Sequence, residues 1–263
     1  MIASGFEGSR SLLDILKAPV HTFQEFIVLA GRTFRGLFRK PYYWDDVFIQ
    51  MDLIGIGSLP VVLLTGFFSG AVMALQMSRA LQTYGATSQV GQIVAITLVR
   101  EMGPVLTALM VAGRNASGMA SELGSMKVTE QIDAMRALGT DPVMKLVKPR
   151  VLATSLMLPL LTILADFVGI VGGWIVACVL LSLTTSAQYW SNSWRALEYN
   201  DITQGLLKPF VFAIVLSLVG CYYGMRTTGG TQGVGRSTTQ AVVVASVWVV
   251  VLTFIIGRIF VSL

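Results

Sequence analysis

Residues 100–150 read REMGPVLTALMVAGRNASGMASELGSMKVTEQIDAMRALGTDPVMKLVKPR, and the order of parts in this stretch indicates the class of protein. The stretch begins with a charged pair, Arg100 and Glu101, inside an apolar run. A tract of small residues follows, then a short segment with helical periodicity, then a basic exit through Pro149 into another apolar run. This order favours a membrane protein that passes movement between a lipid-embedded pathway and the cytosol.

Composition places the chain among integral membrane proteins. Of its 263 residues, 54% are hydrophobic and only 13% are charged, whereas soluble domains carry roughly 25% charged residues. The formal net charge is +5, and much of it lies in segments that we expect in the cytosol, which is the positive-inside bias of membrane proteins. We therefore expect a membrane partner and no nucleic-acid partner.

Five apolar runs are each long enough to cross a bilayer of about 30 Å. The connectors before the third and fifth runs carry lysines and arginines, whereas the connector before the fourth has one cation, Arg195, beside interfacial aromatic residues. The N-terminus is therefore expected in the cytosol and the C-terminus on the far side. The five expected spans are 53–76, 88–118, 151–182, 203–225 and 239–262.

The first fifty residues differ from the rest. Beyond Pro19, apolar positions recur at helical spacing, and cations from Arg32 to Lys40 can bind anionic headgroups. We expect residues 1–50 to form an interfacial amphipathic segment and residues 51–263 to form the five-span domain. A cytosolic helix docked on a partner is the alternative for the first segment. The predicted fold class is an all-α integral membrane protein with one interfacial helix and five transmembrane helices.

The second expected span is too long for one straight crossing, because a straight helix from Gln89 to Ser125 would measure roughly 54 Å. Pro104 lacks an N–H and leaves the carbonyl of Arg100 without its helical partner, which predicts a kink. Two columns of small residues follow, and they predict close approach of another helix, either within the subunit or in a dimer. The columns are Ala112, Ala116, Ala120 and Gly124 beside Gly113, Ser117, Ser121 and Ser125, and Gly66 and Gly70 form a similar pair in the first span.

Charged residues inside the apolar runs are candidates for a functional site. Adjacent helical residues point about 100° apart, so Arg100 and Glu101 are not expected simply to pair with each other. Each faces a polar cavity or pairs with another helix, and the same alternatives hold for Asp166 in the third span. Lys208 in the fourth span is expected to be an anchor that extends its ammonium group to the membrane surface.

The connector at about 129–139 predicts a short helix on the cytosolic side. Thr129 is a suitable N-cap, and Glu130 in the first turn suits the helix dipole. Gly139 is a typical C-terminal stop.

The side chains of this short helix predict what it contacts. Asp133 and Arg136 have the i,i+3 spacing of an ion pair. An apolar edge must be buried either on the protein's own bundle or lipid, or on a separate soluble subunit, and we favour the separate subunit. That edge consists of Ile132, Met135 and Leu138.

The segment DAMRALGTDP, residues 133–142, resembles the EAA loop of ABC importer permeases. In those proteins the loop's coupling helix rests in a groove of the ATPase. This sequence departs from the pattern at Asp133, where the loop has Glu, and at Met135.

Longer blocks resemble the MlaE (YrbE) family, the permeases of MCE-type ABC lipid transporters. The resemblance runs from about residue 45 to the end, and it is specific because several blocks match in order. The blocks are LVREMGPVLTALMVAGR (98–114), ASELGSMKVTEQIDAM (120–135), GTDPVMKLVKPR (139–150) and GGTQGVGRSTTQAVV (229–243).

This resemblance implies a permease homodimer in the inner (cytoplasmic) membrane, with a periplasmic C-terminus. Two cytosolic ABC ATPase subunits would bind ATP and Mg, and a ring of MCE-domain proteins would lie on the periplasmic side. The substrate would be a phospholipid or a similar hydrophobic lipid, moved between the inner membrane and the periplasmic carrier. This chain would bind no cofactor itself.

The resemblance also implies two groups of site residues. A lipid pocket at the dimer interface would receive residues from the end of the first span and the start of the second, whereas coupling to the ATPase would involve the 129–139 helix. The pocket residues would be Met73, Gln76, Leu81, Tyr84, Arg100 and Glu101, and the coupling residues Glu130, Asp133, Met135, Arg136 and Gly139.

Two other classes of function remain open. A proton-coupled secondary transporter of a hydrophobic solute could use Glu101 and Asp166, and it would need no ATPase. An intramembrane enzyme would need a nucleophile or a set of metal ligands. One histidine and two cysteines in apolar runs give no sign of either, so we expect no catalytic residue and no metal site.

Overall fold

The computed structural model describes residues 12–37 and 39–262, and in this part of the chain every regular element is helical. The beginning of the expected interfacial segment lies outside the described residues. The α-helices are α1 (Leu12–Leu37), α2 (Trp44–Thr83), α3 (Val90–Thr97), α4 (Gly103–Val111), α5 (Ser117–Val128), α6 (Gln131–Ala137), α7 (Lys148–Trp174), α8 (Ser186–Ala196), α9 (Tyr199–Met225) and α10 (Gly230–Ser262). A 3-10 turn, η1 (Thr87–Gln89), and four π-helical segments, η2 (Leu98–Met102), η3 (Ala112–Ala116), η4 (Val143–Val147) and η5 (Ile175–Leu180), join or extend them.

In the described part of the chain, five helical stretches are long and apolar enough to cross a membrane, which confirms the predicted all-α membrane fold. Each coincides with one predicted span, but most extend beyond it because the helices continue past the apolar runs into polar sequence. The largest difference is at α10, which begins at Gly230, so the glycine-rich segment expected in a connector is helical. The stretches are Trp44–Thr83, Thr87–Val128, Val143–Leu180, Tyr199–Met225 and Gly230–Phe260.

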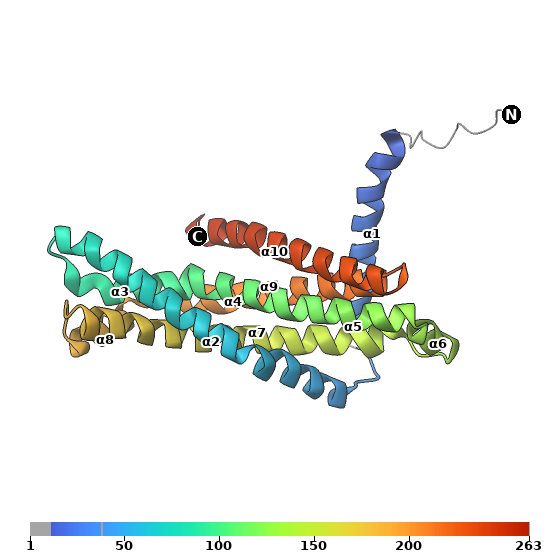
Figure 1. Cartoon of the computed structure of the whole chain (residues 1–263), viewed down its shortest axis with the longest axis horizontal. Helices are drawn as coiled ribbons and strands as arrows, with labels where there is room; N and C mark the ends of the chain where they lie inside the picture. The colour runs from blue at the N-terminus through green and yellow to red at the C-terminus, as the bar shows by residue number, and fades with distance from the viewer. Residues whose placement is uncertain (1–11, 38, 263) are drawn as a thin grey trace.

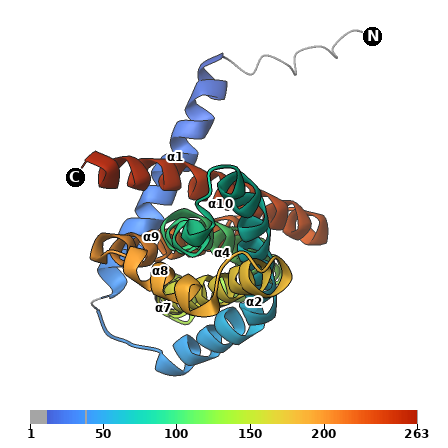
Figure 2. The same cartoon turned by 90° about the vertical axis from the view of Figure 1, so that its left-hand side faces the viewer.

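The five stretches run along the long axis of the molecule, with α6 at one end and α8 at the other (Figure 1). Helix α1 lies across this axis near the end that carries α6, and it projects from the bundle in the view along the axis (Figure 2). Phe26 of α1 packs edge-on against Tyr222 of α9, with 5.7 Å between ring centroids, and Glu25 pairs with Arg226. This orientation fits the predicted interfacial helix, because α1 can lie in the membrane plane while the bundle crosses it.

Helices α2 and α7 lie in close contact because glycines remove the side chains between them. A Cβ atom on Gly70 would lie 1.9 Å from the carbonyl oxygen of Gly169, and a Cβ on Gly66 would lie 2.7 Å from that of Ala165. Such distances leave no room for a side chain. Of the two alternatives for Gly66 and Gly70, close packing within the subunit therefore holds, since their close neighbours are in the same chain.

The two small-residue columns of the second span have different surroundings. The first column is buried, and there Gly220 and Gly224 of α9 approach Ala116 and Ala120 closely. The second column, from Gly113 to Ser125, faces outward, and a Cβ on Gly113 would meet no atom within 4 Å. Packing within the subunit thus explains one column and leaves the other free for a second helix.

Candidate functional site

Directly before the position of the predicted kink at Pro104, the second span contains the π-helical turn η2, which α4 follows. Pro104 has no N–H, so the carbonyl of Arg100 lacks its α-helical hydrogen bond. The ammonium group of Lys208 in α9 donates to this carbonyl at 2.7 Å. A side chain from another helix thus replaces the missing backbone donor.

Four charged side chains meet at this turn, two from η2 and two from α9. Lys208 Nζ lies 2.5 Å from Glu101 Oε1, and Arg100 Nε donates to Asp201 Oδ1. The side chains of Asp201 and Lys208 are fully buried, whereas those of Arg100 and Glu101 are 41% and 46% exposed. Two positive and two negative charges make the cluster neutral, and pairing offsets the desolvation of the buried charges.

The prediction that Lys208 reaches the membrane surface is wrong. Lys208 lies well inside α9, where its ammonium group meets a carboxylate and an unpaired carbonyl before it could reach water. Sequence analysis also missed Asp201, whose second carboxylate oxygen accepts a hydrogen bond from the N–H of Glu198 at 3.1 Å and so caps α9. For Lys208, the signal available in the sequence was the free carbonyl before Pro104, which requires a donor from elsewhere.

The other four predicted pocket residues lie at the end of α2. Met73 and Leu81 are half-buried against the cluster that contains Val90. Gln76 is exposed, and Tyr84, which ends the helix, is 82% exposed. Among the described residues, the hydrogen bonds and ion pairs of the charged η2 side chains go to α9, so the single chain does not join these four residues to them.

The predicted N-cap of the cytosolic helix is wrong. Thr129 instead ends α5, where its hydroxyl donates to the carbonyl of Ser125 at 2.9 Å. Glu130 occupies the N-cap position of α6 with a left-handed φ of 60°. The left-handed conformation is strained for a non-glycine residue. Glu130 adopts it because the chain turns sharply between α5 and α6.

The predicted stop at Gly139 is confirmed. Its φ is 78°, a left-handed conformation that glycine adopts at no steric cost. Its N–H donates to the carbonyl of Arg136, and the N–H of Thr140 donates to that of Met135, both at 3.0 Å. These two bonds form a Schellman motif, which satisfies carbonyls at the end of α6.

The expected pair of Asp133 and Arg136 is present at 3.1 Å. Lys127 of α5, which sequence analysis did not assign, approaches Asp133 more closely, at 2.6 Å. The hydrogen bond from Lys127, together with the charge of Arg136, lowers the pKa of Asp133 below its ordinary value. Asp133 therefore links α6 to the end of the second span.

The three residues of the predicted apolar edge, Ile132, Met135 and Leu138, differ in burial. Ile132 is fully buried and Met135 half-buried in a cluster of the protein's own bundle, so the alternative of burial on the bundle holds for both. Leu138 is 84% exposed, and Ala134 and Ala137 are exposed as well. The surface that α6 leaves for a partner is thus smaller than expected and is centred on Leu138.

The segment after α6 contacts the base of the first span. Lys145 Nζ lies 2.5 Å from Asp46 Oδ2 and 4.2 Å from the ring centroid of Tyr43. Lys148 donates to the carbonyl of Arg39 at 2.8 Å. Side chains of η4 and of the start of α7 therefore hold the connection between α1 and α2 in place.

Comparison with known proteins identifies the family. The family described as Permease MlaE matches residues 47–259, which include η2, the charged cluster and α6. The chain belongs to the MlaE permease family.

Several relatives are similar to most of the chain. A probable ABC transporter permease protein of Rickettsia felis is 41% identical over 225 residues, 86% of each chain. The intermembrane phospholipid transport system permease protein MlaE of Haemophilus influenzae is 36% identical over 211 residues, 80% of each chain. The chloroplastic protein TRIGALACTOSYLDIACYLGLYCEROL 1 of Arabidopsis thaliana is 35% identical over 233 residues, 89% of this chain and 66% of the relative. This MlaE-family chain is accordingly a multi-pass membrane protein of the ABC transporter permease class.

Proposed function

We propose that this chain is the permease subunit of an ABC transporter that moves phospholipid, or a similar lipid, between the inner membrane and a periplasmic MCE-protein carrier. Two copies form the permease, two cytosolic ATPase subunits bind and hydrolyse ATP with Mg, and this chain catalyses no reaction. The N-terminus is cytosolic and the C-terminus periplasmic. The name of the Haemophilus influenzae relative, an intermembrane phospholipid transport system permease, supports this substrate class.

The observation that carries the proposal is the continuous connection between α6 and the charged turn η2. Asp133 of α6 pairs with Lys127 at the end of α5. That end belongs to the same helical stretch, Thr87–Val128, as η2. A push on α6 therefore displaces the helix that carries Arg100 and Glu101, whose ion pairs pass the displacement to α9.

A second route leads from α6 to the first span. The ion pair of Lys145 with Asp46 joins η4 to the start of α2. The glycine contacts at Gly66 and Gly70 hold α2 against α7, so these two helices move together. ATPase closure thus acts on both spans that carry the proposed pocket residues.

The exposed part of α6 is the proposed ATPase dock. Leu138 supplies an apolar side chain that a groove in the ATPase can bury. Asp133, Arg136 and Met135 hold the helix in place, and Gly139 ends it.

The proposed lipid pocket lies between two copies, where the half-exposed side chains of Arg100 and Glu101 meet the substrate. A phosphate group is the natural partner of a guanidinium group, since the two can form charge-assisted hydrogen bonds. The outward column from Gly113 to Ser125 offers a face on which the second copy packs closely. The proton-coupled alternative would need no ATPase, and the exposed Leu138 beside α6 argues against it.

The dock is tested by co-purification and lipid transport with Leu138→Glu. A charge at this exposed position leaves the fold intact, and we expect loss of the ATPase subunits and of ATP-dependent movement of a fluorescent phospholipid from liposomes to the carrier. Leu138→Met keeps an apolar side chain and is expected to retain both. Normal ATPase binding by Leu138→Glu would contradict the proposal.

A further inference from the structure

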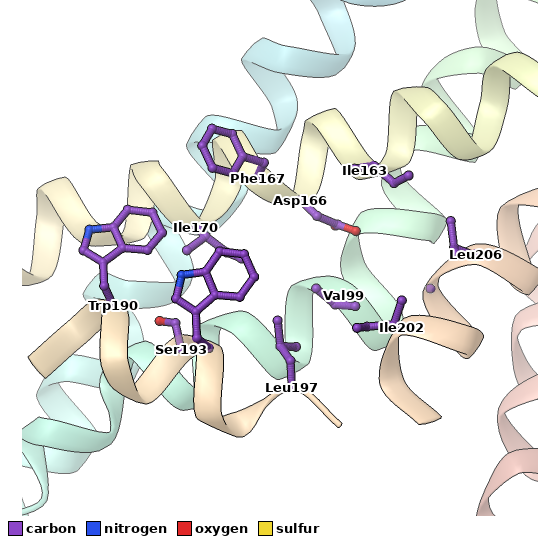
Figure 3. Close-up of a pocket in the computed structure, with 12 residues that line it drawn as sticks. Val99, Ile163, Asp166, Phe167, Ile170, Trp190, Ser193, Leu197, Ile202 and Leu206 are labelled. Atoms are coloured by element: carbon purple, nitrogen blue, oxygen red, sulfur yellow. The ribbon is translucent and has the colours of Figure 1, made fainter. Parts of the chain in front are cut away.

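A cavity of about 290 Å³ lies between α7, α8, α9 and the η2 turn. Its walls are almost entirely apolar, with Val99 of η2 on one side and Ile163 and Ile170 of α7 on another (Figure 3). It opens to the outer surface of the bundle, because Phe167 and Trp194 in its lining are 52% and 64% exposed. A lipid-facing cavity of this kind accepts an apolar ligand.

One carboxyl group interrupts the apolar lining. Asp166 is only 7% exposed, and its Oδ1 is buried without a hydrogen-bond partner among the described residues. Figure 3 shows the side chain extending from α7 towards the ribbon of the second span, between Ile163 and Val99. Buried polar atoms are rarely left unpaired, because each lost hydrogen bond is unfavourable. Oδ1 lies against Gly103, so a partner from outside the chain has to meet the carboxyl group at its other oxygen, Oδ2, from the cavity that Asp166 lines.

The backbone around Asp166 makes room for its carboxyl group. A Cβ atom on Gly103 would lie 1.6 Å from Asp166 Oδ1. Any larger residue at this position would therefore displace the carboxyl group from its place in the lining. The unpaired group is thus built into the cavity and does not result from loose packing.

The surroundings of Asp166 define the partner's chemistry. A carboxyl group without a counter-charge in apolar surroundings is held most easily in its neutral form, which donates one hydrogen bond and accepts others. Its complement is a carbonyl oxygen attached to an apolar chain. Leu197, in the two-residue link between α8 and α9, also lines the cavity. Polar residues flank this link, so we expect the mouth of the cavity close to a membrane surface, where phospholipid ester groups reside.

We propose that this cavity binds one acyl chain of a membrane phospholipid, with Asp166 donating a hydrogen bond to the ester carbonyl. The site belongs to a single subunit and faces the surrounding bilayer. It is separate from the pocket proposed around Arg100 and Glu101, and it does not depend on transport. A phospholipid held here contacts η2 at Val99, which is the neighbour of Arg100 in the charged cluster.

The test is photo-crosslinking of the full-length chain in phosphatidylethanolamine nanodiscs that contain phosphatidylcholine with a diazirine midway along one acyl chain. Peptide mass spectrometry locates the label. We expect the wild type to be labelled within 163–170 of α7 and 202–206 of α9. Leu206→Trp fills the cavity and should reduce this labelling about tenfold. Leu207→Trp, at the neighbouring half-exposed position outside the cavity, should leave it unchanged.

The role of Asp166 is tested with two substitutions of similar size. Asp166→Asn keeps a hydrogen-bond donor and should retain the labelling. Asp166→Leu removes the donor and should reduce the labelling about tenfold, the effect of losing one buried hydrogen bond. Labelling that is insensitive to Leu206→Trp, or equally reduced by Leu207→Trp, would mean general contact with bilayer lipid and would overturn the proposal. Equal labelling of Asp166→Asn and Asp166→Leu would overturn the role of the carboxyl group, and these results do not depend on whether the complex transports lipid.

Discussion

Lys208 Nζ lies 2.5 Å from Glu101 Oε1, and the same ammonium group donates to the carbonyl that Pro104 leaves free. This contact joins α9 to the irregular turn in the second span. It gives Glu101 a structural role in the subunit, whatever the residue contributes to lipid binding. Substitutions at this position must therefore separate loss of folding from loss of function.

Replacing Lys208 with Met should destabilise the protein by about 1–3 kcal/mol, because the Arg100 carbonyl loses its donor and the half-exposed Glu101 loses its counter-charge. The double variant Glu101→Gln with Lys208→Met removes the uncompensated charge and should recover part of that loss. Unfolding of the purified protein in detergent measures both. Equal stability of the wild type and Lys208→Met would show that the ion pair contributes nothing to the fold.

Replacing Gly70 with Ala should destabilise the subunit by about 1–3 kcal/mol, since the new Cβ would overlap the backbone of Gly169 and force α2 away from α7. Gly31→Ala in α1 is the matched control, because its Cβ would meet no atom within 4 Å. The unfolding temperature in detergent should fall for Gly70→Ala and should stay the same or rise for Gly31→Ala. Similar values for the two variants would mean that the α2–α7 contact is looser than the structure indicates.

Replacing Gly113 with Leu should reduce dimer formation without loss of subunit stability. A Cβ atom at this position would meet no atom of its own chain within 4 Å, but a leucine side chain would separate two helices that pack on the outward column. Light scattering in detergent reports the oligomeric state, and the unfolding temperature serves as the control. An unchanged dimer would place the interface on another face.

Replacing Asp133 with Asn should increase amide hydrogen exchange in α6 at neutral pH, because the links to Lys127 and Arg136 weaken. The pKa of Asp133 is lowered in the folded protein, so its contribution is present above the ordinary value of 3.8 and is lost as the pH falls through the lower, folded value. Protection of α6 in the wild type, corrected for intrinsic exchange, should therefore approach that of the variant only below about pH 3.8. A difference that disappears near neutral pH would assign the effect to another group.

Replacing Glu130 with Gly should stabilise the α5–α6 junction by about 1 kcal/mol, because a left-handed conformation is unfavourable for residues with a Cβ. Glu130→Ala retains the strain and is the control. A rise in unfolding temperature for the glycine variant alone is the expected result. A fall would show that the Glu130 side chain makes a contact that outweighs the strain.

The sequence by itself determined the class of protein and the number of membrane-crossing helices. Both follow from the lengths of the apolar runs and from the free energy of transferring each run from water to lipid. This free energy depends on the segment itself and not on its neighbours. The irregular turn before Pro104 and the helix end at Gly139 were predictable for a similar reason. A missing N–H and a glycine act on the backbone within one turn of themselves.

Only the tertiary structure decided which residues the charges and glycines meet. Arg100 and Glu101 find their partners in Asp201 and Lys208, which are about a hundred residues further along the chain. Sequence spacing gives no measure of the distance between helices, so Lys208 looked like a surface anchor although it is fully buried. The division of α6 into a buried Ile132 and an exposed Leu138 likewise depends on how the helix rests on the bundle. Hydrophobicity determines which side chains are stabilised by burial. The packing of neighbouring helices determines which of them find space in the interior.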